Sequence, residues 1–267
     1  MRRVAGADGG CVAHTRSAHP DGDASVDGSA VGSVSVGFRR PGEAMKVVCP
    51  WDRVDADALG MALPWRTFRW HHGQRHYPGS YWSATVRDLV IYESRLELTR
   101  LLYADHDRSV RHIVAQPFLL KAEVSGAVRR HIPDYLLLTD RGPVVVDVKP
   151  RHRMLGQSTV FTFGWTRRTV ESKGWRYEVW NEPPPMELEN VRFLAGFRRD
   201  WLFDPSLLAL LRAADLDGAT LAQAYRFPTG HLRSRVRSAV LHLLWCQHFV
   251  VDFDRPLSLA SVLRRPT

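Results

Sequence analysis

The chain has 267 residues, and its 37 Lys and Arg against 28 Asp and Glu give a formal charge of +9. That length suffices for two small domains or one large one, and the charge suits a polyanionic partner without specifying a sequence. Three widely spaced cysteines argue against a disulfide framework, and no apolar stretch reaches the roughly 18 residues of a membrane span, so we expect a cytoplasmic protein without a membrane partner.

The N-terminal part has a composition typical of disorder. Residues 1–44 are rich in Gly, Ala, Ser, Asp and Val without a periodic pattern, which predicts a disordered extension. Met45 is an alternative start, so the sequence leaves open whether this extension belongs to the native protein. We expect one folded domain over residues 45–187 and another over residues 188–267, joined by the stiff proline-rich stretch Glu182–Pro185.

An amphipathic helix is expected near residues 93–104. Three leucines, at i, i+3 and i+4 counted from Leu98, give it an apolar face. Ser94 and Glu97 match a capping box, in which Glu97 accepts a backbone N–H at the helix start. The functional alternative makes Glu97 an acid of the site predicted next, with Glu93, one turn earlier on nearly the same face, as the competing candidate.

The most informative segment is a predicted β-hairpin. Its strands contain the apolar runs Leu136–Leu138 and Val144–Val146, separated by a turn that contains Gly and Pro. Asp134 and Asp147 lie about equally far from that turn, so their Cβ atoms would be about 4.5–5.5 Å apart if directly opposite. Side chains alternate along a strand, so Lys149 shares a face with Asp147. The hairpin therefore gathers two carboxylates and one ammonium on one side.

Acidic residues facing each other on apolar strands need a partner. Two such carboxylates repel each other, and burying them unpaired is costly. Mg²⁺ relieves both problems, because it prefers a few carboxylate ligands together with waters and phosphate oxygens. The pattern predicts a Mg²⁺ site for cutting phosphodiesters, in which Lys149 adds a fixed cation beside the attacked phosphate. The structural alternative is a turn or edge Asp134 and a surface ion pair between Asp147 and Lys149.

The C-terminal region is predicted to contain helices and then a short strand. The expected helices are Ser206–Arg212, Thr220–Tyr225 and about Thr229–Gln247, and the expected wing strand is Phe249–Phe253. This order is typical of a winged helix-turn-helix. Arg233 and Arg237 lie largely off the apolar face of the third helix, where they would contact DNA or, equally well, help to dock a protein.

These motifs resemble the PD-(D/E)xK nuclease superfamily and, within it, the TnsA endonuclease subunit of heteromeric transposases. The resemblance runs over most of the chain from about residue 45. The segments that carry it are Ser94–Glu97, Gln116–Phe118, Pro133-Asp134, Asp147–Lys149 and Gly174–Tyr177. It implies an α/β fold with a restriction-endonuclease-like core of mixed β-sheet flanked by helices, and a C-terminal winged helix-turn-helix-like domain.

The implied core has the order α-β-β-β-α-β, which this sequence can supply. After the helix near residues 93–104, the expected elements are strands around Ile113–Val114 or Phe118–Val124, then Tyr135–Leu138 and Val144–Val148, a helix from about Gln157 to Ser172 ending at Gly174, and a strand over Arg176–Trp180. A right-handed crossover would place that last strand parallel to the Asp147 strand.

The resemblance also implies roles for individual residues and partners. Asp134 and Asp147 would be metal ligands with Glu97 as the helix acid, Val148 would belong to the metal site, and Lys149 would lie beside the attacking water. The metal would be Mg²⁺, for which Mn²⁺ can substitute. The DNA partner would be transposon ends, cut here at their 5′ ends, while a TnsB-like DDE transposase subunit cuts the 3′ ends and a TnsC-like AAA+ regulator docks on the C-terminal region.

Several basic side chains are candidates for DNA contacts. Apart from the pair on the third C-terminal helix, we expect phosphate contacts from Arg151, Arg153, Arg167 and Arg168. His71, His72 and His76 lack a second cluster of ligands, which favours a basic loop near the DNA over a zinc site.

Two other functions remain open at the level of sequence. One is a restriction or junction-type nuclease of the same superfamily. The other is a non-catalytic winged-helix DNA-binding regulator, in which the nuclease fold is only a scaffold. The intact Asp134, Asp147 and Lys149 argue against the second, because a scaffold without activity has no use for a costly acidic cluster.

Overall fold

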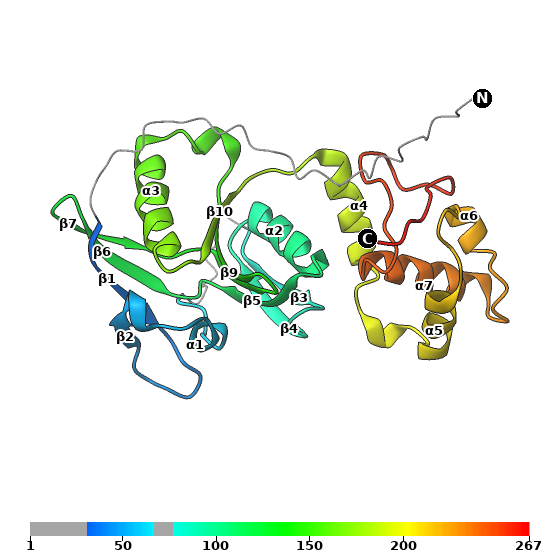
Figure 1. Cartoon of the computed structure of the whole chain (residues 1–267), viewed down its shortest axis with the longest axis horizontal. Helices are drawn as coiled ribbons and strands as arrows, with labels where there is room; N and C mark the ends of the chain where they lie inside the picture. Colours follow the sequence, from blue (N-terminus) through cyan, green and yellow to red (C-terminus); the bar gives the residue numbers. More distant parts are fainter. Residues whose placement is uncertain (1–30, 67–76, 267) are drawn as a thin grey trace, which may run out of the picture.

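The computed structural model describes residues 31–66 and 77–266 (Figure 1). The expected basic loop with His71, His72 and His76 lies outside these residues. The strands are β1 (Val31–Phe38), β2 (Val47–Pro50), β3 (Gly79–Ser83), β4 (Asp88–Tyr92), β5 (Val110–Ala115), β6 (Leu119–Val124), β7 (Ala127–His131), β8 (Tyr135–Thr139), β9 (Gly142–Val148) and β10 (Arg176–Trp180). The helices are α1 (Ala56–Gly60), α2 (Arg95–His106), α3 (Gln157–Glu171), α4 (Pro185–Ala195), α5 (Pro205–Ala213), α6 (Leu221–Ala224) and α7 (Arg233–Trp245), with short 3-10 turns η1 (Trp51–Arg53), η2 (Arg151–Arg153) and η3 (Asp200–Leu202).

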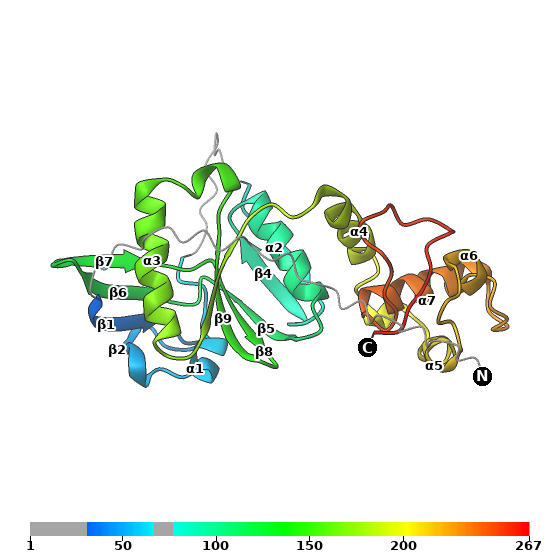
Figure 2. The ribbon, with the colours of Figure 1, turned by 45° about the horizontal axis from the view of Figure 1, so that its top comes forward.

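A mixed central sheet has the strand order β10-β9-β8-β5. Its β9 and β10 are parallel, and the other neighbours are antiparallel. The helix α2 covers one face and α3 the other (Figure 2). Val144 and Val146 of β9 pack into the cluster that contains Leu101 of α2, while Val145 packs with Trp165 of α3. The continuous apolar run of β9 is explained by this burial on both faces.

The elements predicted around the acidic motif are confirmed. Helix α2 begins after Ser94, whose side chain accepts the N–H of Glu97, and α3 is followed by Gly174 with a positive φ of 74°. β8 and β9 pair with Tyr135 opposite Val146. β10 returns parallel to β9 after α3, as a crossover connection requires.

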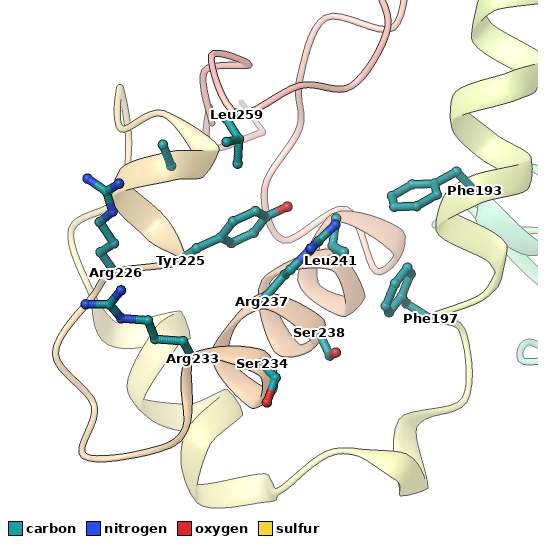
Figure 3. Close-up of a pocket in the computed structure, with 11 residues that line it drawn as sticks. Phe193, Phe197, Tyr225, Arg226, Arg233, Ser234, Arg237, Ser238, Leu241 and Leu259 are labelled. Carbon is teal, nitrogen blue, oxygen red and sulfur yellow. The ribbon is translucent and has the colours of Figure 1, made fainter.

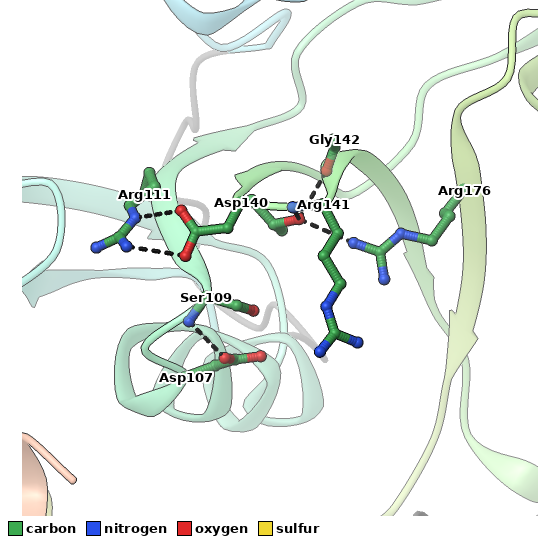
Figure 4. Close-up of polar contacts among 8 residues, drawn as sticks. Asp107, Ser109, Arg111, Asp140, Arg141, Gly142 and Arg176 are labelled. Carbon is green, nitrogen blue, oxygen red and sulfur yellow. Dashed lines mark hydrogen bonds and ion pairs between the residues drawn. The ribbon is translucent and has the colours of Figure 1, made fainter. Parts of the chain in front are cut away.

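The turn between β8 and β9 is fixed by polar contacts (Figure 4). Asp140 receives two hydrogen bonds from Arg111, from Nε at 2.6 Å and from Nη2 at 2.8 Å. Thr139 accepts a bond from Arg176 at 2.8 Å and donates to the carbonyl of Gly142 at 2.7 Å. These contacts connect β5, β8, β9 and β10 at the turn end of the hairpin, and so support the register that places the acids at its other end.

A second sheet, with the order β2-β1-β6-β7, contradicts the expectation for the N-terminal extension. Val36 and Phe38 of β1 are 0% and 1% exposed, so the folded part begins before residue 45 and residues 31–38 are not disordered. Val34, Val36 and Phe38 alternate with small residues, a strand pattern that the Gly- and Ser-rich composition obscured. β6, which was one of two alternatives for the second core strand, also lies in this sheet, and β5 takes that place in the central sheet.

The C-terminal region continues the core of the α2 side. One apolar cluster contains Leu137 and Val146 of the central sheet together with Leu194 of α4, Leu208 of α5 and Leu244 of α7. The helices α5, α6 and α7 fall where the sequence predicted helices. No helix was predicted at α4, which has Pro185 in its first turn.

The predicted wing strand, Phe249–Phe253, is wrong. Its only β pairing in the described part of the chain is a single bridge between Val250 and Arg264. Phe249 and Val251 are buried in the cluster that contains α7, so their apolar character reflects packing against that helix. Within residues 31–66 and 77–266, none of the helices has both the length and the apolar character that a membrane crossing needs.

Candidate active site

Asp134 and Asp147 lie side by side where β8 begins and β9 ends. The N–H of Asp134 donates to the carbonyl of Val146 at 3.1 Å, which continues the β8–β9 pairing beyond Tyr135. The same register sets Asp134 opposite Asp147. Because Val145 packs on the α3 side of the sheet, strand alternation directs Asp147 to that side as well.

Asp147 is anchored by two side chains that the sequence analysis did not assign. It is 3% exposed. Nε2 of His131, at the end of β7, lies 2.9 Å from Oδ1 and 2.8 Å from Oδ2, and the hydroxyl of Tyr177 in β10 donates to Oδ2. Burial, and then the charge of Asp147, raise the pKa of Tyr177, so its hydroxyl stays protonated and remains a donor. The surface ion pair with Lys149, which was the structural alternative, is therefore excluded.

The environment of Asp134 disfavours its ionised form. Burial, the negative charge of Asp147 and then that of Glu97 raise the pKa of Asp134 well above its usual value. The N–H of Val148 donates to Oδ2 of Asp134 at 2.6 Å, and this hydrogen bond lowers the pKa of Asp134 in part. Repulsion between acids in a poorly hydrated space is what a divalent cation relieves.

Glu97 has the structural role that the capping box predicted. Its Oε1 accepts the hydroxyl of Ser94 at 2.9 Å, and its Oε2 accepts the N–H of Glu93 at 2.7 Å. Its charge nevertheless contributes to the raised pKa of Asp134, and Glu93 contributes less. The structure therefore gives Glu97 a cap at α2 and an electrostatic influence on the acidic pair, while the choice of metal-ligating helix acid stays a prediction.

Gln116 connects Glu93 to the acidic pair. Its Nε2 donates to Oε1 of Glu93 at 2.5 Å, and its backbone N–H donates to the carbonyl of Asp134 at 2.8 Å. Gln116 has a φ of 45°, an uncommon conformation for a residue other than glycine. Gln116 belongs to one of the segments that carry the family resemblance, but no role was predicted for it. In the structure Gln116 links the segment before α2 to the start of β8.

Lys149 follows β9 directly. Its backbone N–H donates to the carbonyl of Trp180 at 2.8 Å, so the chain remains beside β10 at this position. Its side chain is partly exposed, and no ion pair to its ammonium is found among the described residues. Because Lys149 is two positions after Asp147, strand alternation is expected to place both side chains on the same face.

Of the predicted DNA-contacting arginines, four lie on the elements that follow Lys149. Arg151 donates to Oδ1 of Asn181 at 3.2 Å, and Arg153 is exposed on the same turn, η2. Arg167 in α3 bonds Glu171 at 3.1 Å, and its guanidinium lies 5.1 Å from the ring of Tyr177. Arg168 has a buried Nε without a hydrogen-bond partner in the described chain.

Arg233 and Arg237 belong to a different part of the molecule. They line a groove of about 580 Å³ on α7, together with Tyr225, Phe193 and Phe197 (Figure 3). Figures 1 and 2 place α7 at the opposite end of the molecule from α3. The structure does not bring these two arginines to the acidic pair. Whether they contact DNA or help to dock a protein stays a prediction.

The residues at the acidic pair fit a hard divalent cation in their chemistry. Carboxylate oxygens are ligands that Mg²⁺ prefers, and Asp134 is destabilised by the neighbouring charges that such an ion would neutralise. In the described residues no three His, Cys, Asp or Glu side chains surround a common metal position. Since both oxygens of Asp147 already accept hydrogen bonds, metal binding requires Asp147 to share or exchange those bonds. Val148 contacts the acidic pair through its N–H, which donates to Asp134, and its predicted place in the metal site stays a prediction.

No protein-family model and no curated protein sequence matches this chain.

Proposed function

We propose that this chain is a Mg²⁺-dependent DNA endonuclease of the PD-(D/E)xK type, acting as the TnsA-like subunit of a heteromeric transposase that cuts the 5′ ends of the transposon. The observation that carries the proposal is the pairing of Asp134 with Asp147 on adjacent strands, where burial and the charge of Asp147 raise the pKa of Asp134. The succession α2, β5, β8, β9, α3, β10 supports it, because the resemblance implies that order.

Each residue of the site has a distinct task in this mechanism. The carboxylates of Asp134 and Asp147 would hold Mg²⁺, which when bound lowers the pKa of a water and neutralises charge on the phosphate. His131 and Tyr177 orient Asp147 through its two oxygens. Lys149 supplies a fixed positive charge next to the phosphate oxygens, on which negative charge develops.

The partners follow from the same proposal. A TnsB-like DDE transposase subunit would cut the 3′ ends, and a TnsC-like AAA+ regulator would bind the C-terminal region. The Arg- and Phe-lined groove on α7 is compatible with such a role, although it also presents cations that DNA could contact.

A reconstituted excision reaction tests this function. Asp134→Ala and Lys149→Ala should each lower 5′-end cleavage about 100-fold or more, the usual effect of removing one group that stabilises the transition state. Lys173→Ala is the matched control, because its ammonium donates to the carbonyl of Asp52 and makes no contact with Asp134 or Asp147 among the described residues. Unchanged 5′ cleavage in either test variant would remove the catalytic assignment. Efficient DNA cleavage without any partner subunit would instead favour a restriction or junction-type nuclease with this site.

A further inference from the structure

The β6–β7 hairpin carries a basic edge that lies beside α3. β7 is the edge strand of the sheet β2-β1-β6-β7, and Figures 1 and 2 both show it next to α3. Arg129 and Arg130 are exposed on it, and Val128 is 65% exposed. Neither arginine forms an ion pair with an acidic side chain in the described part of the chain, so both guanidinium groups keep donors for a ligand.

Strand alternation ties this edge to the acidic pair. Arg129 and His131 are two residues apart and therefore project to the same face of β7, whereas Arg130 projects to the other face and lines the groove from the strand edge. Arg129 lies over Phe161 of α3, with its guanidinium carbon 5.1 Å from the ring centre, and the His131 ring is 6.2 Å from that of Trp165. His131 in turn holds Asp147. Side chains of β7 and α3 thus form a continuous series of contacts from the basic edge to the buried carboxylate of Asp147.

The space between β7 and α3 is a groove of about 610 Å³. It is lined by Val128, Arg129 and Arg130 of β7 and by Gln157, Ser158 and Phe161 of α3, among others. None of its lining residues is acidic, and the polar ones can donate hydrogen bonds. Arg129 is held against Phe161, so less side-chain freedom is lost when its planar fork binds an anion.

We propose that the groove between β7 and α3 binds the phosphate backbone of the DNA next to the bond that is cut, with Arg129 and Arg130 as the phosphate contacts. This deepens the proposed function and rests on it for the identity of the ligand. Arginine donates two parallel hydrogen bonds to a phosphate, whereas the surrounding hydroxyl and amide groups match the remaining oxygens. A nucleic acid is favoured over an acidic protein segment because Trp165, which lines the groove, packs against His131, and His131 holds Asp147, so a bound phosphate backbone would lie close to the proposed cleavage site.

Fluorescence anisotropy of the full chain with a labelled 30-base-pair duplex, in EDTA to prevent cleavage, tests the groove. The variant is Arg129→Ala/Arg130→Ala. The control, Arg141→Ala/Arg192→Ala, removes the same charge from exposed arginines on the β8–β9 turn and on α4. Removing two phosphate contacts should lower the slope of log K against log salt by about 1.8. Between 50 and 200 mM salt, the wild type should then lose about twelvefold more affinity than the variant.

The control should keep the wild-type slope, and Arg129→Lys/Arg130→Lys should restore the slope while binding more weakly than wild type. An unchanged slope in the alanine variant overturns the proposal. If that variant also loses assembly with a partner subunit, the groove belongs to an acidic protein surface. The two proposals fail separately. A wild type that cleaves nothing with all partners present, but whose DNA binding still depends on Arg129 and Arg130, refutes the nuclease function and keeps the groove.

Discussion

Replacing Asp134 with Asn is expected to make the metal-free protein more stable at neutral pH. Burial and the charge of Asp147 raise the pKa of Asp134 above its usual value of 3.8, so the folded state binds this proton more tightly than the unfolded state does. The stabilisation from that proton is fully present below pH 3.8 and is lost as the pH rises through the pKa of the folded state. As the pH rises above 3.8 the unfolded state ionises freely while the folded environment disfavours the ionised form, so the wild type loses stability that the neutral amide keeps.

The magnitude follows from the charges. Two carboxylates about 5 Å apart, the separation of facing residues in adjacent strands, repel by about 3 kcal/mol at an effective dielectric constant of 20. In Asp134→Asn the introduced amide oxygen can still accept the N–H of Val148, but a neutral acceptor forms a bond weaker by about 1 kcal/mol. A net gain of about 2 kcal/mol remains, which corresponds to a rise of about 4–8 °C in Tm.

Thermal unfolding of wild type and Asp134→Asn in EDTA, from pH 4 to pH 8, measures this effect. The difference in Tm should be small at pH 4 and should grow as the pH rises. Adding Mg²⁺ at pH 7.5 should raise the Tm of the wild type but not that of the variant, because an ion one hundredfold above its Kd stabilises by about 2.7 kcal/mol. A variant that is less stable than wild type at pH 7.5, or a difference that does not change with pH, would refute the electrostatic reasoning.

Three further changes test other contacts. Tyr177→Phe removes a donor to Asp147, and should lower Mn²⁺ affinity about 10–100-fold, whereas the control Tyr225→Phe should not; equal affinities would show that Tyr177 does not position the carboxylate. Asp105→Ala should cost at least about 3 kcal/mol in urea unfolding, because buried Asp105 accepts bonds from the hydroxyls of Tyr81 and Ser83 and from the backbone N–H groups of Ala84 and Thr85; a loss under about 1 kcal/mol would contradict this. Burial lowers the pKa of His106 from 6.5 to about 4, so the stability that neutral His106 contributes is present above pH 6.5 and is lost as the pH falls toward 4. His106→Asn should remove that pH-dependent loss of stability, which amounts to about 3 kcal/mol in total. An unchanged pH profile of stability would exclude His106 as its source.

Much of the central sheet could be predicted because its signals are local. The β8–β9 hairpin follows from two apolar runs and a turn of Gly and Pro, and the ends of α2 and α3 follow from Ser94 and Gly174. The facing of Asp134 and Asp147 needed only their equal distance from that turn. Each of these inferences uses contacts between residues fewer than about twenty positions apart.

The rest depends on contacts between distant segments. Strand β1 is stabilised by β6, about ninety positions later, so its own composition suggested disorder. His131 and Tyr177 reach Asp147 from strands in two different sheets, and no spacing in the sequence indicates that meeting. The Phe249–Phe253 run looks like a strand because it is apolar, but its partner is a helix.

Calorimetric titration of Mn²⁺ into wild type and Asp134→Asn tests the central claim most directly. The variant is expected to fold at least as stably as wild type, so a loss of binding would not reflect unfolding. Shared coordination by Asp134 and Asp147 predicts that the wild type binds one ion and that the variant binds it at least about tenfold more weakly. Equal affinities, or a wild type that takes up no Mn²⁺, would contradict a metal site at these two carboxylates.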